Sequence, residues 1–263
     1  MTDLTGQVVL VTGASSGLGE QLALAAATAG ATVVLMARRQ ARLTRVADQC
    51  RILSAAPAVA LAGDISSVAA VDHVFATIDE LYGRLDVVIN AAGFGYLAPA
   101  VEIDQAAMAK MLRVNTLGVM YVSQLAAKKM LTAGHGEIVN IASMAGKMAT
   151  PKSAVYAATK AALIAYDNAL RLELRAANIN VLTVNPGPIT TDFFKTADPT
   201  GHYLDAVSWL ALNPVKLAEQ IVGKLGHHRR ELNIPWVMNA ANLGYQLAPK
   251  LGDWLAGSVF NFK

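Results

Sequence analysis

Short hydrophobic runs alternate with longer amphipathic stretches along most of the chain. The short runs are rich in β-branched residues and apolar at successive positions, which is typical of strands buried on both faces of a parallel sheet. We expect strands at Val8–Thr12, Thr32–Met36, Ala58–Ala62, Val87–Asn90, Glu137–Ile141, Asn180–Val184 and Leu232–Ile234. We expect helices at Gly17–Ala29, Ala41–Leu53, Val68–Leu81, Gln105–Leu131, Ala154–Ala176 and Pro214–Leu225. This alternation predicts an α/β fold with an open, doubly wound, seven-stranded parallel sheet and helices on both faces.

The same pattern bears on the number of domains. An eight-fold barrel is the alternative topology, but the chain is one strand–helix unit short of it. No linker, repeat or block of charge divides the sequence. We therefore expect a single domain over residues 1–263.

Composition narrows the class of protein. Of 263 residues, 54% are hydrophobic and only 16% are charged, whereas an average soluble domain is about 25% charged. This excludes intrinsic disorder and leaves a membrane protein or a protein with a large core. The longest charge-free runs, 21–37 and 232–249, are interrupted by Gly30 and by Pro235, so we expect no transmembrane span. No signal-peptide pattern opens the chain and Cys50 is the sole cysteine, so we expect a cytoplasmic protein without disulfides.

Charge gives little sign of a macromolecular partner. The net charge is +3, and the basic residues cluster only locally. Such clusters lack the interleaved aromatic residues that stack nucleic-acid bases, so we expect no nucleic-acid partner. His227 and His228 are adjacent but have no apparent third ligand, so we expect no metal.

A glycine-rich turn follows the first expected strand and opens the first expected helix. Glycines permit tight turns and close approach of the backbone to a pyrophosphate, while the helix N-terminus presents N–H groups to the anion. The strand–turn–helix context favours dinucleotide binding over an ordinary turn. The candidate residues are Gly13, Ser15, Ser16, Gly17, Leu18 and Gly19.

The end of the second expected strand indicates which dinucleotide is bound. An NAD site places Asp or Glu here to bind the ribose 2′-hydroxyl. This chain has Ala37 followed by Arg38 and Arg39. Because a guanidinium can pair with a 2′-phosphate through two hydrogen bonds, we expect NADP(H) to be preferred over NAD(H).

A second group of residues indicates proton transfer. Tyr156 and Lys160 lie four residues apart, on one face of an expected helix. A neighbouring ammonium lowers the pKa of a phenol, so the pair could exchange a proton with an alcohol or carbonyl. Ser143 follows the fifth expected strand, at the carboxyl edge of the sheet where such folds bind ligands.

Together with the residues that follow, these motifs resemble those of the short-chain dehydrogenase/reductase family. Asn90-Ala91-Ala92-Gly93, Asn115 and Pro186-Gly187 complete the family's motifs in its order and spacing, over a match from Gly6 to about Leu225. The resemblance implies a Rossmann-like fold and an oxidoreductase that interconverts a ketone or aldehyde and an alcohol.

The resemblance also implies a role for each matching residue. Tyr156 would be the general acid/base, Ser143 would hydrogen-bond the carbonyl oxygen, and Lys160 would lower the pKa of Tyr156 and bind the nicotinamide ribose. Asn115 would hold a helix kink and a water molecule that links Lys160 to solvent. The remaining residues would bind the cofactor: Asp64 and Ile65 at the adenine, Asn90, Ala91, Ala92 and Gly93 along the cleft, and Pro186, Gly187, Ile189 and Thr191 around the nicotinamide.

The sequence says little about which substrate the protein binds. Apolar and aromatic residues in the segments that should face it suit a hydrophobic carbonyl compound, although any one of them could be core or lid packing. The candidates are Phe94, Met144, Met148, Phe193 and Trp209, with Tyr96, Phe194, His202 and Tyr203 beside them. Residues 190–212 lie where this family has a mobile lid, which we expect to be weakly ordered without cofactor.

The tail, residues 236–263, departs from shorter family members. Leu243, Leu247, Leu251 and Leu255 form an apolar stripe with Trp254, interrupted by Pro249. It could contact another subunit, close over the substrate or lie on a membrane surface. Subunit contact is favoured because the lysine-rich face of a membrane-surface helix is absent. A homodimer or homotetramer is expected.

Two classes of function remain open. One is an NADP(H)-dependent carbonyl reductase, and the other is a non-catalytic NADP-binding regulator on the same fold. The complete Asn115, Ser143, Tyr156 and Lys160 set favours the enzyme. Within the enzymes, a 3-oxoacyl reductase is disfavoured because the segment Lys147–Ser153 lacks an Asn-x-Gly-Gln stretch.

Overall fold

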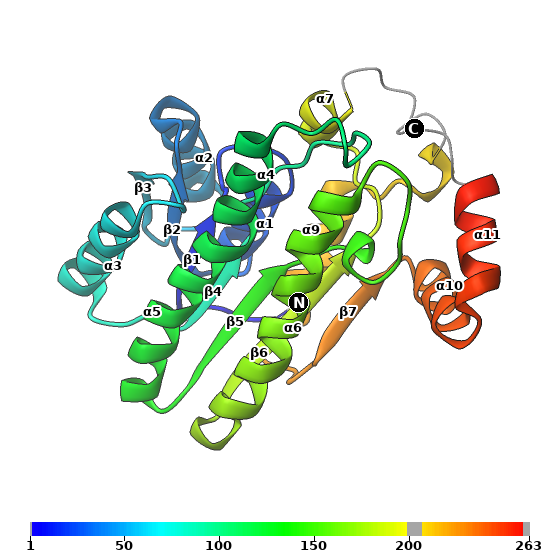
Figure 1. Ribbon diagram of the computed structural model, residues 1–263. Helices are drawn as coiled ribbons and strands as arrows, with labels where there is room; N and C mark the ends of the chain where they lie inside the picture. The colour runs from blue at the N-terminus through cyan, green and yellow to red at the C-terminus, as the bar shows by residue number, and fades with distance from the viewer. Residues whose placement is uncertain (1, 199–206, 260–263) are drawn as a thin grey trace.

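In the computed structural model, which describes residues 2–198 and 207–259, seven strands form one parallel sheet (Figure 1). The strands are β1 (Val8–Thr12), β2 (Thr32–Ala37), β3 (Ala58–Ala62), β4 (Val87–Asn90), β5 (Gly136–Ile141), β6 (Ile179–Pro186) and β7 (Glu231–Ile234). Their order in the sheet is β3-β2-β1-β4-β5-β6-β7. The predicted open, doubly wound sheet is confirmed. The order reverses between β1 and β4, which is where such sheets bind ligands.

Helices cover both faces of the sheet, as Figure 1 shows. One face packs against α1 (Gly17–Thr28), α2 (Gln40–Leu53) and α9 (Pro214–Val222). The other packs against α3 (Val68–Tyr82), α5 (Val119–Ala133) and α6 (Ala154–Leu174). Side chains alternate between the faces along a strand, so Val9 and Val11 lie in one core while Val8 and Leu10 lie in the other. This explains why the strands are apolar at successive positions.

Local sequence sets where the helices begin and end. The Ser67 side chain accepts a hydrogen bond from the Ala70 N–H at the start of α3, and Gly83 ends that helix in the left-handed region, with φ 64°. Asn213 caps α9 in the same way, directly before Pro214 at the first helical position. These residue types stabilise helix ends that hydrophobic periodicity alone leaves undefined.

The expected single helix over 105–131 is wrong. The structure has α4 (Gln105–Leu112), then a π-helical segment (Arg113–Gly118), then α5. Asn115 and Thr116 lie in this segment, and their side chains bond to residues outside the helix. A locally widened turn of this kind is frequent at functional sites. Hydrophobic periodicity does not reveal it, because the buried residues of the segment, Asn115, Thr116 and Gly118, carry no apolar side chain.

The tail forms a helical hairpin beyond β7. It consists of α10 (Trp236–Leu247) and α11 (Pro249–Val259), and Pro249 starts the second helix. The Tyr245 hydroxyl donates to an Asp253 carboxylate oxygen at 2.8 Å, which joins the two helices. Among the described residues, no helix is long and apolar enough to cross a bilayer.

Candidate active site

A cleft of about 480 Å³ runs along the carboxyl ends of the strands, within the usual range for ligand sites. It extends from the loop after β1, past the ends of β4 and β5, to α6 and the segment after β6. Most of the predicted site residues lie along it. The predicted cofactor residues that line it are Gly13, Ser15, Ser16, Gly17, Leu18, Gly19, Arg38, Arg39, Asp64, Ile65, Ala91, Ala92, Gly93, Tyr156, Lys160, Pro186, Gly187, Ile189 and Thr191.

The glycine-rich loop forms a cradle at one end of the cleft. Gly13 has φ +70°, and a Cβ there would lie 2.7 Å from the Cα of Ala92. A Cβ at Gly19 would lie 2.4 Å from the carbonyl oxygen of Gly13. Helix α1 begins at Gly17, and the Ser16 side chain makes no capping hydrogen bond to it. The first N–H groups of α1 therefore suit an anion such as a pyrophosphate.

Positive charge gathers beside this cradle. One guanidinium nitrogen of Arg39 donates to the Ser15 hydroxyl at 2.9 Å and to the Ser16 hydroxyl at 2.8 Å. Partial burial, then repulsion from Arg42 and Arg38, lowers the pKa of Arg39. Arg38 also lines the cleft, and Ala37 occupies the position at the end of β2 where an NAD site has a carboxylate. An anionic group bound here would relieve the repulsion.

Asp64 lies beyond the end of β3 on the same side of the cleft. Burial alone would raise its pKa, but hydrogen bonds from the Ser66 hydroxyl and N–H and the charge of Arg38 outweigh that effect. The pKa of Asp64 is therefore below its ordinary value. The carboxylate is held in a fixed orientation, able to accept a hydrogen bond from a ligand.

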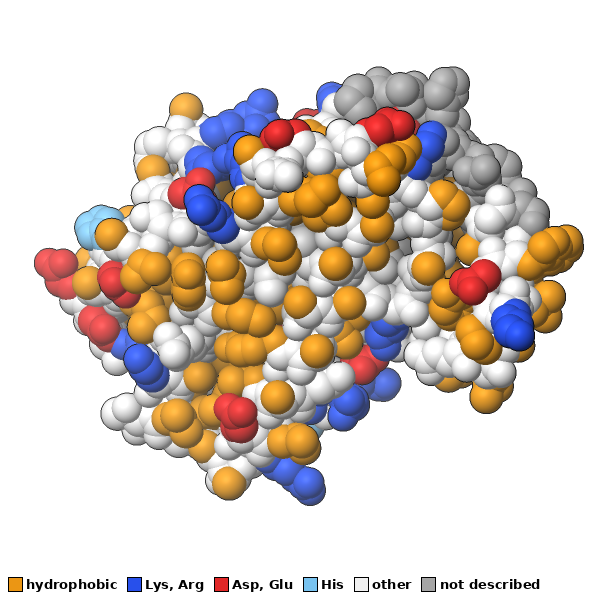
Figure 2. Space-filling view, in the orientation of Figure 1, with side chains coloured by type: hydrophobic (Ala, Val, Ile, Leu, Met, Phe, Trp, Pro, Cys, Tyr) orange, Lys and Arg blue, Asp and Glu red, His pale blue; other side chains and the backbone are white. Residues whose placement is uncertain are grey.

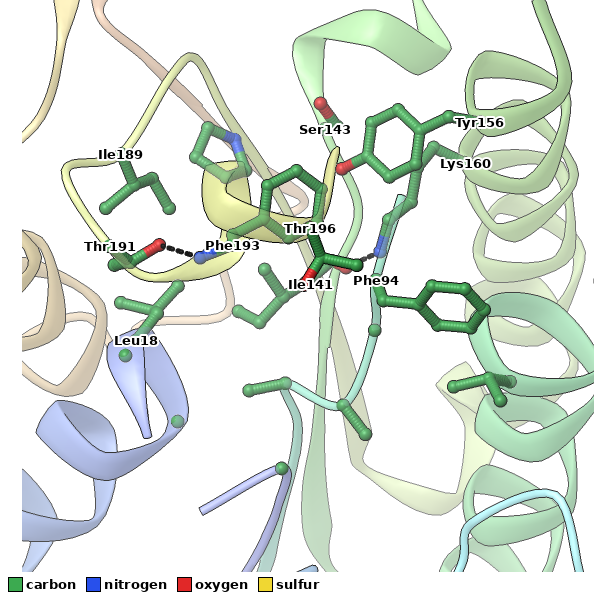
Figure 3. Close-up of a pocket in the computed structure, with 18 of the residues that line it drawn as sticks. Leu18, Phe94, Ile141, Ser143, Tyr156, Lys160, Ile189, Thr191, Phe193 and Thr196 are labelled. Carbon is green, nitrogen blue, oxygen red and sulfur yellow. Dashed lines mark hydrogen bonds between the residues drawn. The ribbon is translucent and has the colours of Figure 1, made fainter. Parts of the chain in front are cut away.

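Ser143, Tyr156 and Lys160 meet at the other end of the cleft, where Figure 3 shows their side chains together. Ser143 follows β5, and its Oγ accepts the Ala145 N–H at 3.1 Å, which fixes the side chain. Tyr156 and Lys160 come from successive turns of α6. The Lys160 Nζ donates to the Ile141 carbonyl oxygen at 2.7 Å. The segment after β5 and helix α6 thus present a hydroxyl, a phenol and an amine to one space.

Lys160 is only 5% exposed. Burial lowers the pKa of this amine from its ordinary 10.5 to about 8, and the charge of Asp167 opposes the effect. The ammonium therefore loses its proton much closer to neutral pH than an exposed lysine does. A group of this kind can both stabilise a phenolate and pass on a proton.

Asn115 holds the loop after β4 in place at this end of the cleft. Its amide nitrogen donates to the Phe94 carbonyl at 2.8 Å, and its amide oxygen accepts the Phe94 N–H at 3.0 Å. A further bond reaches the Thr159 hydroxyl at 3.2 Å. The π-helical segment thus clamps the loop after β4 to α6. The water molecule assigned to Asn115 by resemblance stays a prediction.

Apolar and aromatic side chains surround the space next to Tyr156. Phe193 lies against the Tyr156 ring, with centroids 5.7 Å apart, and packs edge-on to Phe194. Phe94, Met144 and Met148 also line the cleft, as predicted. Sequence reasoning missed Leu97, Asp192, Thr196 and Met238, which line it as well. Met238 comes from α10, so the tail reaches the site, which was one of the three alternatives for this segment, although the sequence does not single out Met238.

Two predicted positions need correction. Asn90 does not line the cleft: its side chain points into the core beneath, where it bonds to Asn140 and Ser123. Trp209 is 73% exposed and lies away from the cleft. Its 3₁₀ segment has three residues per turn, so Val207 and Leu210 face inward and Trp209 faces out. His202 and Tyr203 lie outside the described residues.

The fold and the site together define a class of protein. The parallel sheet carries a glycine cradle at its switch point, and a hydroxyl, a phenol and an amine lie at the far end of the same cleft. This combination is typical of dinucleotide-dependent oxidoreductases. Residues 7–201 match the family model described as "short chain dehydrogenase". The chain belongs to this family and is an oxidoreductase that acts on CH–OH groups.

Known relatives agree with this assignment. An uncharacterized oxidoreductase of Staphylococcus aureus is 34% identical over 200 residues, covering 76% of this chain and 85% of that protein. The Drosophila melanogaster dehydrogenase/reductase SDR family protein 7-like is 33% identical over 267 residues, covering 96% and 80%. The crystal structure of the Brucella melitensis 3-ketoacyl-(acyl-carrier-protein) reductase, complexed with NADH, superposes with a TM-score of 0.80 at 29% identity, covering 88% and 98%.

Proposed function

We propose that this protein is an NADP(H)-dependent carbonyl reductase/alcohol dehydrogenase that acts on a hydrophobic ketone or aldehyde. The observation that carries the proposal is the meeting of Ser143, Tyr156 and Lys160 in the same cleft as the glycine cradle. The bound cofactor would supply the hydride. The chain's own residues would position the carbonyl group and handle the proton.

Tyr156 would donate its phenolic proton to the carbonyl oxygen as that oxygen gains negative charge. The Ser143 hydroxyl would hydrogen-bond the same oxygen, because its side chain is fixed beside the phenol. Lys160 would favour the phenolate that remains, since a positive charge lowers the pKa of a neighbouring phenol. Alcohol oxidation would use the same groups in reverse, with Tyr156 as the base.

The preference for NADP(H) rests on Arg38 and Arg39. Arg39 is already oriented by Ser15 and Ser16, so little side-chain freedom would be lost when it pairs with a 2′-phosphate. Dissociation constants for NADPH and NADH should converge in Arg38→Ala and Arg39→Ala, and Ala37→Asp should favour NADH. Arg51→Ala is the control, because Arg51 pairs with Asp48 on α2. An unchanged ratio in all three site variants would refute the preference.

A substrate screen tests the activity itself. We expect NADPH oxidation with hydrophobic ketones or aldehydes, because the space beside Tyr156 is lined by Phe193, Phe94 and Met148. A 3-oxoacyl reductase is the second candidate, supported by the structural likeness to the Brucella reductase. Turnover confined to 3-oxoacyl thioesters would favour this candidate. No turnover with any carbonyl compound or alcohol would refute both. A lid role for residues 190–212 stays a prediction.

We also propose that the tail hairpin contacts a second copy of the chain, in a homodimer or homotetramer. Its side chains Trp236, Leu247, Leu251 and Trp254 are largely exposed, and Figure 2 shows apolar surface on the hairpin beside few charges. Large exposed apolar side chains gathered on one element are typical of interaction surfaces. Leu247→Lys with Leu251→Lys should lower the mass in solution, whereas Val101→Lys, an exposed apolar residue elsewhere, should not. An unchanged mass in the double variant would refute this interface.

A further inference from the structure

A row of polar side chains crosses the sheet at one register, beneath the cleft. Thr12 on β1 is paired with Asn90 on β4, Asn90 with Asn140 on β5, and Asn140 with Thr183 on β6. All four are at most 1% exposed, on the face that buries apolar strand residues such as Leu10, Ile138 and Val181. Polar groups in such a core are costly unless they are hydrogen-bonded. The row therefore needs a partner that completes its hydrogen bonds.

That partner is Asp167, a fully buried acid on α6. Thr12 donates to the Asn90 amide oxygen at 3.3 Å, and Asn90 donates to the Asn140 amide oxygen at 2.9 Å. Asn140 then donates to one carboxylate oxygen of Asp167 at 2.5 Å, and Thr183 donates to the other at 2.8 Å. Every donor in the row thus points toward Asp167. Only an acceptor at this position satisfies the whole row in that orientation.

The far end of the row supports the cleft. The Ala92 N–H donates to the Thr12 hydroxyl at 3.3 Å. Ala92 and Ala91 line the cleft, and the Ala92 backbone is the group that a Cβ at Gly13 would strike. The position of this loop therefore depends on a hydrogen-bonded row that ends at Asp167.

Asp167 also bears on the charge of Lys160. The two residues lie seven positions apart, two turns along one face of α6, and Lys160 bonds to Ile141, the strand neighbour of Asn140. Among the described residues, Asp167 is the carboxylate whose charge stabilises the buried ammonium. A buried charge without a compensating partner is strongly unfavourable.

None of the other groups that face Asp167 supplies a negative charge in its place. On α6, the charge of Arg171 lowers the pKa of Asp167, and Tyr166 is its neighbour in sequence. From β5 and β6 it faces the neutral Asn140 and Thr183. Arg230, before β7, bonds to Asn168 and lies near Arg171, which adds a second cation at that end.

We propose that Asp167 is a positioning residue for the reaction at Tyr156 and Lys160. Its carboxylate supplies the counter-charge for the Lys160 ammonium and, as the common acceptor, fixes the row of Asn140, Asn90 and Thr12 under the cleft. The inference rests on the proposed function, in the roles of Tyr156 and Lys160.

The pH dependence of the stability reports the charge that Asp167 carries in the folded protein. Burial raises the pKa of Asp167 from 3.8 to about 7. A folded-state pKa above the unfolded value means that the group stabilises the protein below about pH 4, and that this stability is lost as the pH rises to about 7. Asp167→Asn cannot ionise at this position, so its stability should not fall over this pH range. The amide offers one acceptor oxygen to Asn140 and Thr183 where the carboxylate offers two, and the loss of stability that this causes is the same at every pH, so it cancels when the two pH dependences are compared.

The experiment measures Asp167→Asn in two ways: the pH dependence of alcohol oxidation, and the Tm of the cofactor-free protein across pH. Without the counter-charge, Lys160 loses its proton at lower pH and stabilises the Tyr156 phenolate less. The apparent pKa of the acid limb of oxidation should rise by about one pH unit, with at least about tenfold lower turnover at neutral pH. The Tm of the variant should fall less between about pH 4 and pH 7 than the wild-type Tm does.

Asp86→Asn is the matched control. Asp86 is also a buried acid, but it bonds to Arg84 and the Val8 N–H at the opposite end of β4. This variant should lose stability and keep the wild-type pH profile. If Asp167→Asn does not fold, Asp167→Glu takes its place: it retains the charge, so it should keep the apparent pKa but bind NADPH more weakly, because its oxygens are displaced from Asn140.

Several results would overturn the inference. The first is a wild-type pH profile and wild-type turnover in Asp167→Asn. The second is a loss of stability in Asp167→Asn like that of Asp86→Asn, without a shift in the pH profile of alcohol oxidation. The third is a shifted apparent pKa of alcohol oxidation in Asp167→Glu. Tyr156→Phe distinguishes this failure from failure of the proposed function. If Tyr156→Phe loses turnover and Asp167→Asn does not, only the role of Asp167 is wrong.

Discussion

Replacing Lys160 with methionine should make the protein more stable near neutral pH and inactive. Methionine fills a similar volume without a charge. The difference between the ordinary lysine pKa of 10.5 and a pKa of about 8 corresponds to about 3 kcal/mol of destabilisation by the buried ammonium. Because the folded-state pKa is the lower one, this destabilisation is full below about pH 8 and disappears as the pH rises to about 10.5.

The assay is denaturant unfolding of wild type and Lys160→Met across this pH range. The advantage of the variant over wild type should shrink by about 3 kcal/mol between pH 8 and 10.5. The lost hydrogen bond to the Ile141 carbonyl lowers the stability of the variant by a similar amount at every pH, so it cancels in this comparison. Lys128→Met on the exposed face of α5 is the control and should show no such change. A stability difference that does not vary with pH would show that the Lys160 ammonium does not destabilise the folded protein.

Three further substitutions test the rest of the site. Gly19→Ala should weaken NADPH binding at least about tenfold in a fluorescence titration, because its Cβ would lie 2.4 Å from the Gly13 carbonyl oxygen. Gly244→Ala is the control: the space around Gly244 is open, so this variant should bind NADPH normally. Ser143→Ala should lower kcat about 10²-fold with little change in the NADPH dissociation constant, and an unchanged kcat would remove Ser143 from the mechanism. Asn115→Ala leaves the Phe94 N–H and carbonyl unpaired, so it should cost about 1–3 kcal/mol in denaturant unfolding, and wild-type stability would contradict the clamp.

Much of the fold and site could be predicted because they depend on local signals. Buried parallel strands must be apolar on both faces, and the glycine loop needs residues without a Cβ at fixed spacing. The same holds for Tyr156 and Lys160, whose four-residue spacing places them together on any helix. For these features the sequence and the structure agree, and the strand ends differ from the expected ones only slightly: β6, for example, runs from Ile179 to Pro186 where Asn180–Val184 was expected.

The remaining features depend on contacts between distant segments. Asn90 ends a strand at the cleft edge, but the pleat turns its side chain into the core, where register pairs it with Asn140. Trp209 faces outward because of a single 3₁₀ turn. Met238 reaches the cleft only because the hairpin folds back across the end of β6, where its sulfur would meet a Cβ at Gly187. No local pattern encodes these three arrangements.

In the proposed reaction the Tyr156 phenol supplies the proton for carbonyl reduction. The direct measurement is turnover of Tyr156→Phe with NADPH and a hydrophobic ketone that the wild type reduces, beside a titration of NADPH binding. We predict a loss of about 10²–10⁴-fold in kcat with NADPH affinity nearly unchanged, since the phenyl ring still packs against Phe193. Retained turnover in a variant that binds NADPH normally would contradict the claim.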